Sequence, residues 1–169
     1  NLDPSQLVKV VIYVAKFEDK SEIPIIVSIR GDQLINEVKL FNTINKQSKS
    51  NLLSLSILDQ ESNSVNNLNN IPFGFLGPDL EDNRINISSK WEKKWLRIID
   101  FSAYELSKFI SGANKENYHK FFNSWNFLKQ EFITADVRSA KEGDYISLDK
   151  NETLVKKRGI EIGHIFQLG

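Results

Sequence analysis

The stretch Ile25–Lys39 decides the fold of this chain and reads Ile-Ile-Val-Ser-Ile-Arg-Gly-Asp-Gln-Leu-Ile-Asn-Glu-Val-Lys. Its first part, Ile25–Ile29, is almost entirely β-branched and therefore predicts a buried strand. Upstream, Leu7–Ala15 is nearly continuous in apolar residues and predicts a second, central strand. The charged residues between these segments are typical of a turn, so we expect a hairpin. Further along, Leu52–Leu58 alternates leucine and serine, which fits a half-exposed strand or a short helix.

A short helix is predicted directly after the Ile25–Ile29 strand. The composition of Arg30-Gly31-Asp32 is that of a turn, and apolar residues then recur at helical spacing up to Val38. Asp32 is placed to cap the start of this helix, and Lys39 lies at its end. A lysine held at a fixed distance from a sheet edge is a cationic anchor for a phosphate. On the pattern alone, a solvated lysine stabilised by the helix macrodipole is the commoner case.

Composition narrows the class of protein. With 169 residues, the chain is long enough for one domain with a hydrophobic core. The 22 lysines and arginines balance the 22 aspartates and glutamates, so any contact with a polyanion must be local. The absence of cysteine excludes disulfides and thiolate metal sites, and His119 and His164 are too far apart for a spaced metal motif. No apolar run is long enough for a membrane helix, so we expect a soluble, cytoplasmic protein. The absence of methionine indicates a piece of a longer protein.

Three further positions carry residues that suit a functional site. Ile71–Pro78 contains two glycines and two prolines, which fix an irregular backbone. Such glycines let a backbone N–H approach a ligand, although an ordinary tight turn is the commoner explanation. Asp100 ends a predicted strand, where it either faces a cleft or caps the helix that follows. His119 lies in an aromatic-rich strand, and a lone histidine of this kind is more often a core residue than a catalyst.

The closing segment makes the sequence recognisable. Lys157–Gly169 reads Lys-Arg-Gly-Ile-Glu-Ile-Gly-His-Ile-Phe-Gln-Leu-Gly and closely resembles the point where bacterial-type prolyl-tRNA synthetases re-enter their class II catalytic core after a large insertion. Upstream motifs resemble, in order, those of the family's inserted editing domain, which is similar to the YbaK-type aminoacyl-tRNA deacylases. They are Arg30-Gly31-Asp32 with Asn36-Glu37-Val38-Lys39, the Gly-x-x-x-Pro loop Gly74–Pro78, Ile99-Asp100, Gly112-Ala113-Asn114 with His119, and Ala135-Asp136-x-Arg138 with Gly143-Asp144.

The resemblance implies hydrolysis of alanine wrongly esterified to tRNA(Pro). A pocket shaped for proline cannot strongly reject a smaller side chain, because a few missing methylenes change binding by only about 1–3 kcal/mol. In the family, the residue matching Lys39 contacts a phosphate of the tRNA 3′ end and the residue matching His119 sizes the alanine pocket. The catalytic residues that the resemblance implies are Lys39, Gly74, Gly77, Pro78, Asp100 and His119. The substrate-binding residues that it implies are Lys39, Gly74, Phe75, Leu76 and His119. The loop would supply backbone donors around the ester, and the attacking water would be positioned by backbone groups and the terminal ribose hydroxyl.

The resemblance also implies the architecture and the partners. We expect an α+β fold with a mixed, largely antiparallel β-sheet or partial barrel and flanking helices. Residues 1–157 would form the editing domain, and residues 158–169 the return segment into the catalytic core. The partners would be the 3′ end of tRNA(Pro) carrying alanine and the rest of a homodimeric synthetase, with no membrane contact. The editing domain would need no metal or cofactor, whereas the parent synthetase would use ATP and Mg²⁺.

Two alternatives share this fold. The segment could be a non-catalytic module that positions the tRNA acceptor end. It could also be a free-standing trans-editing deacylase, although the synthetase-like tail Lys157–Gly169 argues against that.

Overall fold

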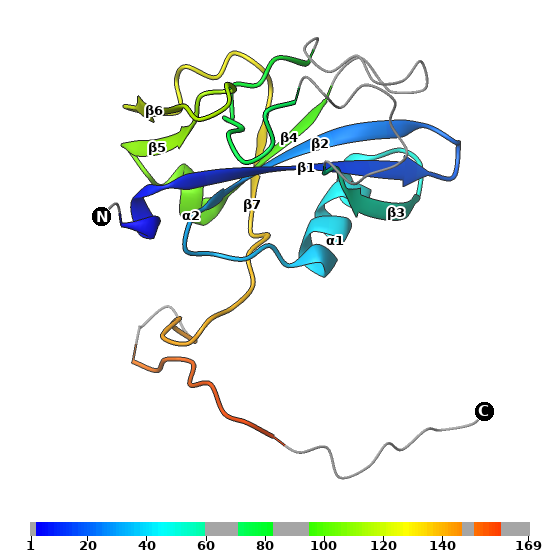
Figure 1. Ribbon diagram of the computed structural model, residues 1–169. Helices are drawn as coiled ribbons and strands as arrows, with labels where there is room; N and C mark the ends of the chain where they lie inside the picture. The colour runs from blue at the N-terminus through cyan, green and yellow to red at the C-terminus, as the bar shows by residue number, and fades with distance from the viewer. Residues whose placement is uncertain (1–2, 60–70, 83–94, 147–150, 160–169) are drawn as a thin grey trace, which may run out of the picture. The chain divides into compact units, whose positions relative to one another are not determined.

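The computed structural model describes residues 3–59, 71–82, 95–146 and 151–159 (Figure 1). Two compact units divide the chain, Asn1–Arg138 and Ser139–Gly169. Within its described residues, the second unit has an isolated antiparallel bridge between Tyr145 and Thr153. The stretch Gln60–Asn70, whose many asparagines and serines predict a surface loop, lies outside the described residues. Residues 160–169 of the predicted return segment also lie outside them, and the predicted boundary after residue 157 stays a prediction. No helix in the described part of the chain is long and apolar enough to cross a membrane.

A long antiparallel hairpin forms the centre of the first unit. β1 (Val8–Phe17) pairs with β2 (Glu22–Arg30), from Val8 opposite Arg30 to Lys16 opposite Glu22. β3 (Leu52–Ile57) pairs antiparallel with the other side of β1. The predicted hairpin is therefore confirmed, and so is the strand alternative for Leu52–Leu58.

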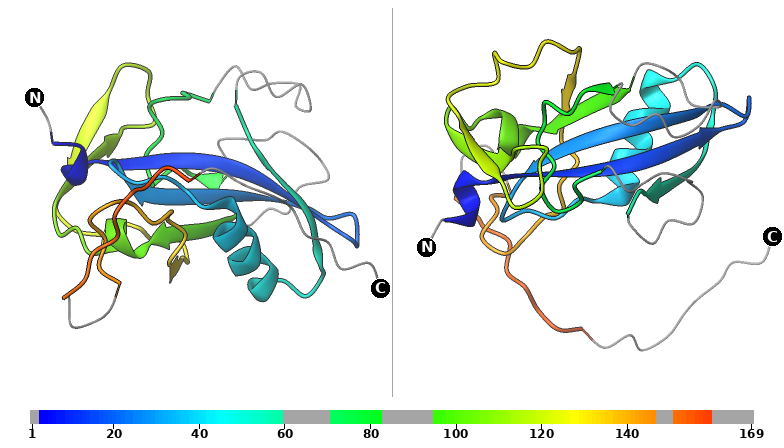
Figure 2. Two further views of the ribbon diagram at one scale, coloured as in Figure 1. Left: turned by 90° about the horizontal axis from the view of Figure 1, so that it is seen from below. Right: turned by 45° about the horizontal axis from the view of Figure 1, so that its top comes forward.

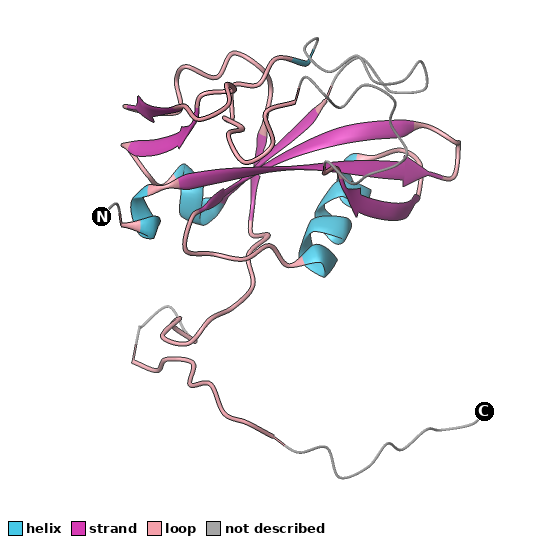
Figure 3. Ribbon diagram, in the orientation of Figure 1, coloured by secondary structure: helices cyan, strands magenta, loops and turns pink. Residues whose placement is uncertain are grey.

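Two parallel strands complete the sheet beyond β2. β4 (Leu96–Asp100) runs parallel to β2, and β7 (Ile133–Ala135) runs parallel to β4. The order of the five strands is β3-β1-β2-β4-β7, so β1 and β2 both lie inside the sheet as their apolar sequences predict. The predicted mixed α+β class is confirmed. The described strands form an open sheet and do not close into a barrel (Figure 3).

The two faces of the sheet are covered by different segments, because alternate side chains of a strand point to opposite faces. On one face, Tyr13, Ala15, Ile25 and Val27 pack against Leu40 and Ile44 of helix α1 (Glu37–Gln47). On the other face, Ile12, Val14 and Ile26 pack against Ile71, Leu76 and Leu80 of the segment 71–82. In Figure 1, α1 accordingly lies below the sheet and this segment lies above it.

An aromatic cluster joins the remaining elements at one end of the sheet. β5 (Phe109–Gly112) and β6 (His119–Phe122) form a separate two-stranded antiparallel sheet. Rings stack or tilt against one another with centroids 4.4 to 6.4 Å apart, the members being Phe109, Phe122, Trp125 and Phe127. The short helix α2 (Phe101–Tyr104) contributes Ala103 to the same cluster. The 3₁₀ turn η1 (Pro4–Gln6) precedes β1 at the start of the chain (Figure 2).

The predicted start of the lysine helix is wrong. α1 begins at Glu37, and Asn36 is its N-cap because its side chain accepts a hydrogen bond from the backbone N–H of Lys39 at 3.0 Å. Asp32 instead accepts from the guanidinium of Arg30 at 2.6 and 3.1 Å. The helix continues to Gln47, so Lys39 lies in the first turn and not at the end. The expected stabilisation by the negative end of the macrodipole therefore does not apply.

Candidate functional site

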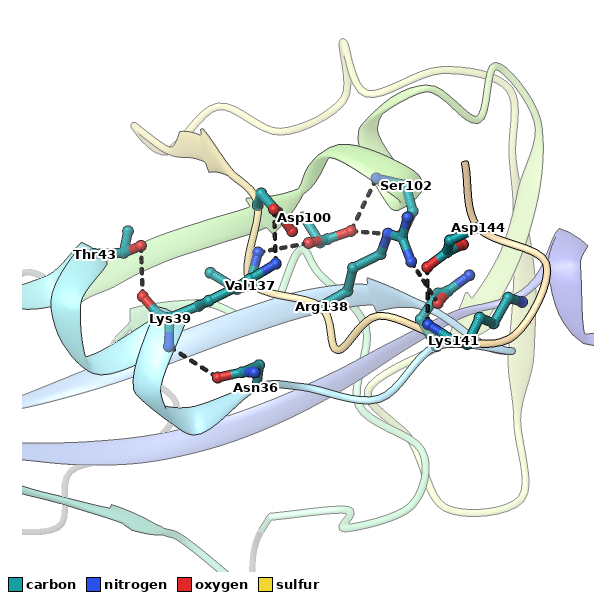
Figure 4. Close-up of polar contacts among 11 residues, drawn as sticks. Asn36, Lys39, Thr43, Asp100, Ser102, Val137, Arg138, Lys141 and Asp144 are labelled. Carbon is teal, nitrogen blue, oxygen red and sulfur yellow. Dashed lines mark hydrogen bonds and ion pairs between the residues drawn. The ribbon is translucent and has the colours of Figure 1, made fainter. Parts of the chain in front are cut away.

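The carboxyl ends of the three parallel strands meet at one edge of the sheet. β2 ends at Arg30, β4 at Asp100 and β7 at Ala135. Ligands of sheets with parallel strands commonly bind outside such ends, because the segments that leave them lie side by side there. Two of the predicted site residues, Lys39 and Asp100, lie in this region (Figure 4).

Asp100 is fully buried and anchors two segments. One carboxylate oxygen accepts hydrogen bonds from the backbone N–H of Ser102 at 2.9 Å and from its hydroxyl at 2.5 Å. The other oxygen accepts from the backbone N–H of Val137 at 2.8 Å, which joins the ends of β4 and β7 (Figure 4). The helix-capping alternative is therefore confirmed. At 0 % exposure, Asp100 holds the residues after β7 in place, and its predicted role in the reaction stays a prediction.

Lys39 is paired with a carboxylate. Its Nζ lies 2.8 Å from Oδ2 of Asp136, and the two side chains are 41 % and 54 % exposed. A cation in the first turn of a helix is disfavoured by the positive end of the macrodipole, and Asp136 supplies the compensating charge. Because both groups are reached by solvent, an incoming phosphate would compete with Asp136 for the lysine.

A second set of polar residues lies beside this pair. The Arg30 guanidinium binds Asp32 through two nitrogens, and these hydrogen bonds raise the pKa of Arg30. The buried side chain of Gln33 donates to Asp32 at 3.4 Å and accepts from Arg138 at 3.5 Å. Arg30 and Arg138 are therefore joined in one network through Asp32 and Gln33, and Lys39 forms a separate ion pair with Asp136.

The Gly74–Pro78 loop forms a turn with one open corner. The backbone N–H of Phe75 donates to the carbonyl of Pro72 at 2.9 Å, and Gly74 has a φ of 83°, a left-handed conformation that favours glycine. A side chain added at Gly74 would meet nothing within 4 Å. This corner is thus open to a ligand, whereas Leu76, Gly77 and Pro78 are buried.

The loop is pressed against β5 through two glycines. A Cβ at Gly112 would lie 2.2 Å from the backbone carbonyl of Phe75, and a Cβ at Gly77 would lie 2.3 Å from the carbonyl oxygen of Gly112. Asn114, just after β5, accepts from the backbone N–H of Gly77 at 2.7 Å. The structure therefore brings together the predicted Gly-x-x-x-Pro and Gly-Ala-Asn motifs.

His119 borders the same loop. Its ring meets the ring of Phe75 edge-on, with centroids 5.6 Å apart. His119 is exposed at the start of β6. The interpretation of this histidine as a core residue is therefore wrong, because its aromatic neighbours in the sequence form the cluster while the imidazole faces outward.

A buried arginine holds the residues that follow the loop. Arg97 of β4 is 2 % exposed and donates to the backbone carbonyl of Leu80 at 2.6 Å and to the carboxylate of Asp82. Burial lowers the pKa of Arg97, although Asp82 opposes this effect. Arg97 thus fixes the far end of the loop against the sheet.

The predicted site residues form two groups on opposite faces of the sheet. Lys39 belongs to α1 on one face, while the Gly74–Pro78 loop and His119 belong to the other. Within the described residues, the side chain of Lys39 has its polar contact with Asp136 and none with the loop. Both groups nevertheless lie toward the same end of β1, because Val8 pairs with Arg30 and Leu7 bridges to β5.

The sequence reasoning missed two roles. Asp136 and Asn114 were each recognised only as a member of a motif, without a partner. Neither role has a local signal, since each partner lies far away in the chain: Lys39 is 97 positions from Asp136, and Gly77 is 37 positions from Asn114.

A cavity of about 700 Å³ lies away from both groups. It opens at the amino ends of β4 and β7, and its lining includes Ile25, Ile44, Leu96 and Ile133. None of the predicted site residues contributes to it.

Comparison with known proteins identifies the relatives of this chain. It is 58% identical over 169 residues to the proline--tRNA ligase of Prochlorococcus marinus subsp. pastoris (strain CCMP1986 / NIES-2087 / MED4), a match that covers 100% of this chain and 28% of the relative. The chain is homologous to a segment of proline--tRNA ligase. Ligases of P. marinus strains MIT 9312 and NATL2A are 58% and 49% identical over 169 and 166 residues, again over 28% of their length. The resemblance to prolyl-tRNA synthetases is thus confirmed. No protein-family model matches the chain.

One solved structure agrees with the fold. The hypothetical protein APE2540 aligns over 82% of this chain and 77% of its own, with 16% identity and a TM-score of 0.51. A candidate trans-editing enzyme for prolyl tRNA synthetase aligns over 81% and 73%, with 10% identity and a TM-score of 0.49. At 16% identity, the likeness to APE2540 speaks for the fold alone.

Proposed function

We propose that this chain is a hydrolytic editing domain that acts in cis within a prolyl-tRNA synthetase and removes alanine from mischarged tRNA(Pro). The homology to proline--tRNA ligase supports the parent enzyme. The proposal includes the rest of that synthetase, as a cytoplasmic homodimer that uses ATP and Mg²⁺, and assigns no cofactor to this segment.

The observation that carries the proposal is the open corner of the Gly74–Pro78 loop. Three residues of the loop region have no backbone N–H to offer a ligand. The N–H of Phe75 donates to the carbonyl of Pro72, the N–H of Gly77 donates to Oδ1 of Asn114, and Pro78 has no N–H. The backbone N–H groups of the exposed Gly74 and the buried Leu76 have no acceptor among the described residues, and that of Gly74 lies at the open corner. Fixed donors of this kind stabilise the oxyanion that develops when water attacks an ester.

The reaction then needs little from side chains. Water adds to the ester carbonyl, the bond to the ribose oxygen breaks, and alanine leaves as the acid while the ribose hydroxyl regains a proton. The terminal ribose hydroxyl and backbone groups would position the water. His119 and Phe75, which meet edge-on, would form a wall that admits the alanine methyl group and excludes the proline ring.

Lys39 would bind a phosphate of the tRNA 3′ end. Its position in the first turn of α1 adds the N-terminal end of the helix to the charge of the ammonium group. Since α1 and the loop cover opposite faces, the phosphate bound by Lys39 would precede the ester along the nucleotide chain, which would pass around the shared end of the sheet.

The test is alanine release from preformed Ala-tRNA(Pro) by the full-length synthetase, with Lys39→Ala beside the wild type. We expect rapid release by the wild type, strongly reduced release by Lys39→Ala, and no release of proline from Pro-tRNA(Pro). Normal proline charging by both proteins would show that the synthetase body is intact.

A second candidate is the non-catalytic positioning module. The separation of Lys39 from the loop by the sheet favours it, because a phosphate anchor can guide an acceptor end without any ester chemistry. An intact alanine ester with both proteins, together with weaker binding of tRNA by Lys39→Ala, would support this candidate and overturn the editing proposal.

A further inference from the structure

Asn114 directs its backbone N–H and both polar atoms of its side-chain amide at the segment 75–79. Its backbone N–H donates to the carbonyl of Phe75 at 2.9 Å, its Oδ1 accepts from Gly77 N–H at 2.7 Å, and its Nδ2 donates to Oδ1 of Asp79 at 2.9 Å. The orientation of the amide is forced, because the reverse would set an NH₂ group against an N–H and an oxygen against a carboxylate. Asn114 is 5 % exposed; its hydrogen bond with Gly77 is buried and that with Asp79 is partly buried.

The backbone of Asn114 also suits this task. Its φ of 55° lies in the left-handed region, which asparagine tolerates better than most residues. This conformation turns the chain after β5 so that both the main chain and the side chain face the loop. A residue without the side-chain amide could keep the turn but would leave the N–H of Gly77 without its partner.

Lys120 completes the arrangement from β6. Its ammonium group pairs with Asp79, and the two side chains are 40 % and 28 % exposed. Lys120 follows His119 directly and pairs with Ser111 of β5. The strand that carries His119 is therefore tied to the loop through Lys120, Asp79 and Asn114.

The consequence concerns which donors the loop presents. Because the N–H of Gly77 donates to Asn114, the backbone N–H groups of the loop without an acceptor among the described residues are those of Gly74 and Leu76. If Gly77 were released, the loop could rotate its peptide groups and the donor pair would lose its geometry. A displacement of about 1 Å in such a site can lower a rate by about 100-fold.

We propose that Asn114 is a positioning residue of the editing site, with Asp79 and Lys120 holding its amide in the required orientation. This inference rests on the proposed hydrolysis of the alanine ester. Asn114 touches no reacting atom and acts by fixing the loop, so its loss should lower the rate of the chemical step more than the affinity for tRNA.

The experiment exchanges the polarity of one hydrogen bond in the full-length synthetase. Asn114→Asp keeps the acceptor for Gly77 but sets two carboxylates against each other. In the double variant Asn114→Asp with Asp79→Asn, the hydrogen bond between positions 79 and 114 is restored with its direction reversed, because position 79 now donates and position 114 accepts. The amide oxygen at position 79 would still accept from Lys120. The matched control is Asn117→Asp, because Asn117 also has a left-handed φ, of 63°, but is exposed.

For steady-state alanine release, we expect Asn114→Asp to lower kcat about 10- to 100-fold with KM changed by less than about threefold. The double variant should recover most of the rate, and Asn117→Asp should match the wild type. Equal rates for Asn114→Asp and wild type, or no recovery in a folded double variant, would overturn the proposal.

Amide hydrogen exchange of Gly77 separates this inference from the proposed function. We expect Asn114→Gly, which keeps the left-handed backbone, to speed exchange at Gly77 while the core strands stay protected. If wild-type enzyme released no alanine, the proposed function would fail and exchange at Gly77 alone would decide whether Asn114 fixes the loop. Unchanged exchange in Asn114→Gly would refute the fixing role.

Discussion

The ammonium group of Lys39 lies 2.8 Å from the carboxylate of Asp136, although 97 positions separate the two residues. Asp136 is in turn held in place by its neighbour Val137, whose N–H is bound by the buried Asp100. The ammonium group proposed to bind a tRNA phosphate therefore already forms an ion pair with a carboxylate of the same domain.

We predict that Asp136→Asn strengthens the binding of a tRNA acceptor-stem analogue to the full-length synthetase. An exposed ion pair contributes up to about 1 kcal/mol, so its removal should raise the affinity by up to about fivefold at low salt. Binding titrations at several salt concentrations measure this effect. The double variant Lys39→Ala with Asp136→Asn should lose the gain, and a gain that persists without Lys39 would show that the two residues are not competing partners for phosphate.

Asp100→Ala should destabilise the fold strongly. The substitution leaves the buried N–H of Val137 and the partly buried N–H of Ser102 without their acceptor and removes the cap of α2, at a combined cost of about 2–4 kcal/mol. Urea denaturation monitored by circular dichroism measures this loss. Asp100→Asn keeps one acceptor oxygen and should cost less; equal stability of Asp100→Ala and wild type would contradict the anchoring role.

Gly112→Ala should displace the Gly74–Pro78 loop. The added methyl group would lie 2.2 Å from the backbone of Phe75, which cannot move aside as a flexible side chain can. We expect a loss of about 1–3 kcal/mol in the free energy of unfolding and a large loss of alanine release. Gly159→Ala is the control, since nothing lies within 4 Å of that position. A fully active Gly112→Ala enzyme would show that the loop does not need its contact with β5.

Tyr13 should make the stability of the domain fall at high pH. Burial raises the pKa of Tyr13 to about 12 from the ordinary 10.0, with a smaller contribution from Glu37. A raised pKa means that the folded state holds the proton more tightly, so this stabilisation is complete below about pH 10 and is lost as pH rises toward 12. The loss should reach roughly 2–3 kcal/mol. Denaturation of Tyr13→Phe and wild type at pH 9, 10 and 11 compares the slopes; parallel slopes would disprove the assignment.

Much of the fold could be predicted from local sequence. The β-branched run of β2 and the apolar run of β1 become interior strands because both faces of each are covered, which is what continuous apolar sequence requires. Asp100 could be recognised as a cap because a cap acts within a few residues. The start of α1 was missed because Asp32 and Asn36 are both good caps, and the pairing of Asp32 with Arg30 leaves the capping position to Asn36.

The motifs and the homology of the chain could be recognised from sequence alone, and the prediction that Lys39, Gly74 and His119 belong to one functional set also comes from sequence. Only the tertiary structure decided that α1 and the Gly74–Pro78 loop cover opposite faces of one sheet. It also decided that Asp136 forms an ion pair with Lys39 and that Asn114 accepts a hydrogen bond from the N–H of Gly77. The physical reason is the distance along the chain over which each interaction acts. Strand and helix patterns reflect burial and capping among near neighbours in the chain, whereas these contacts form only after the folded sheet brings distant segments together.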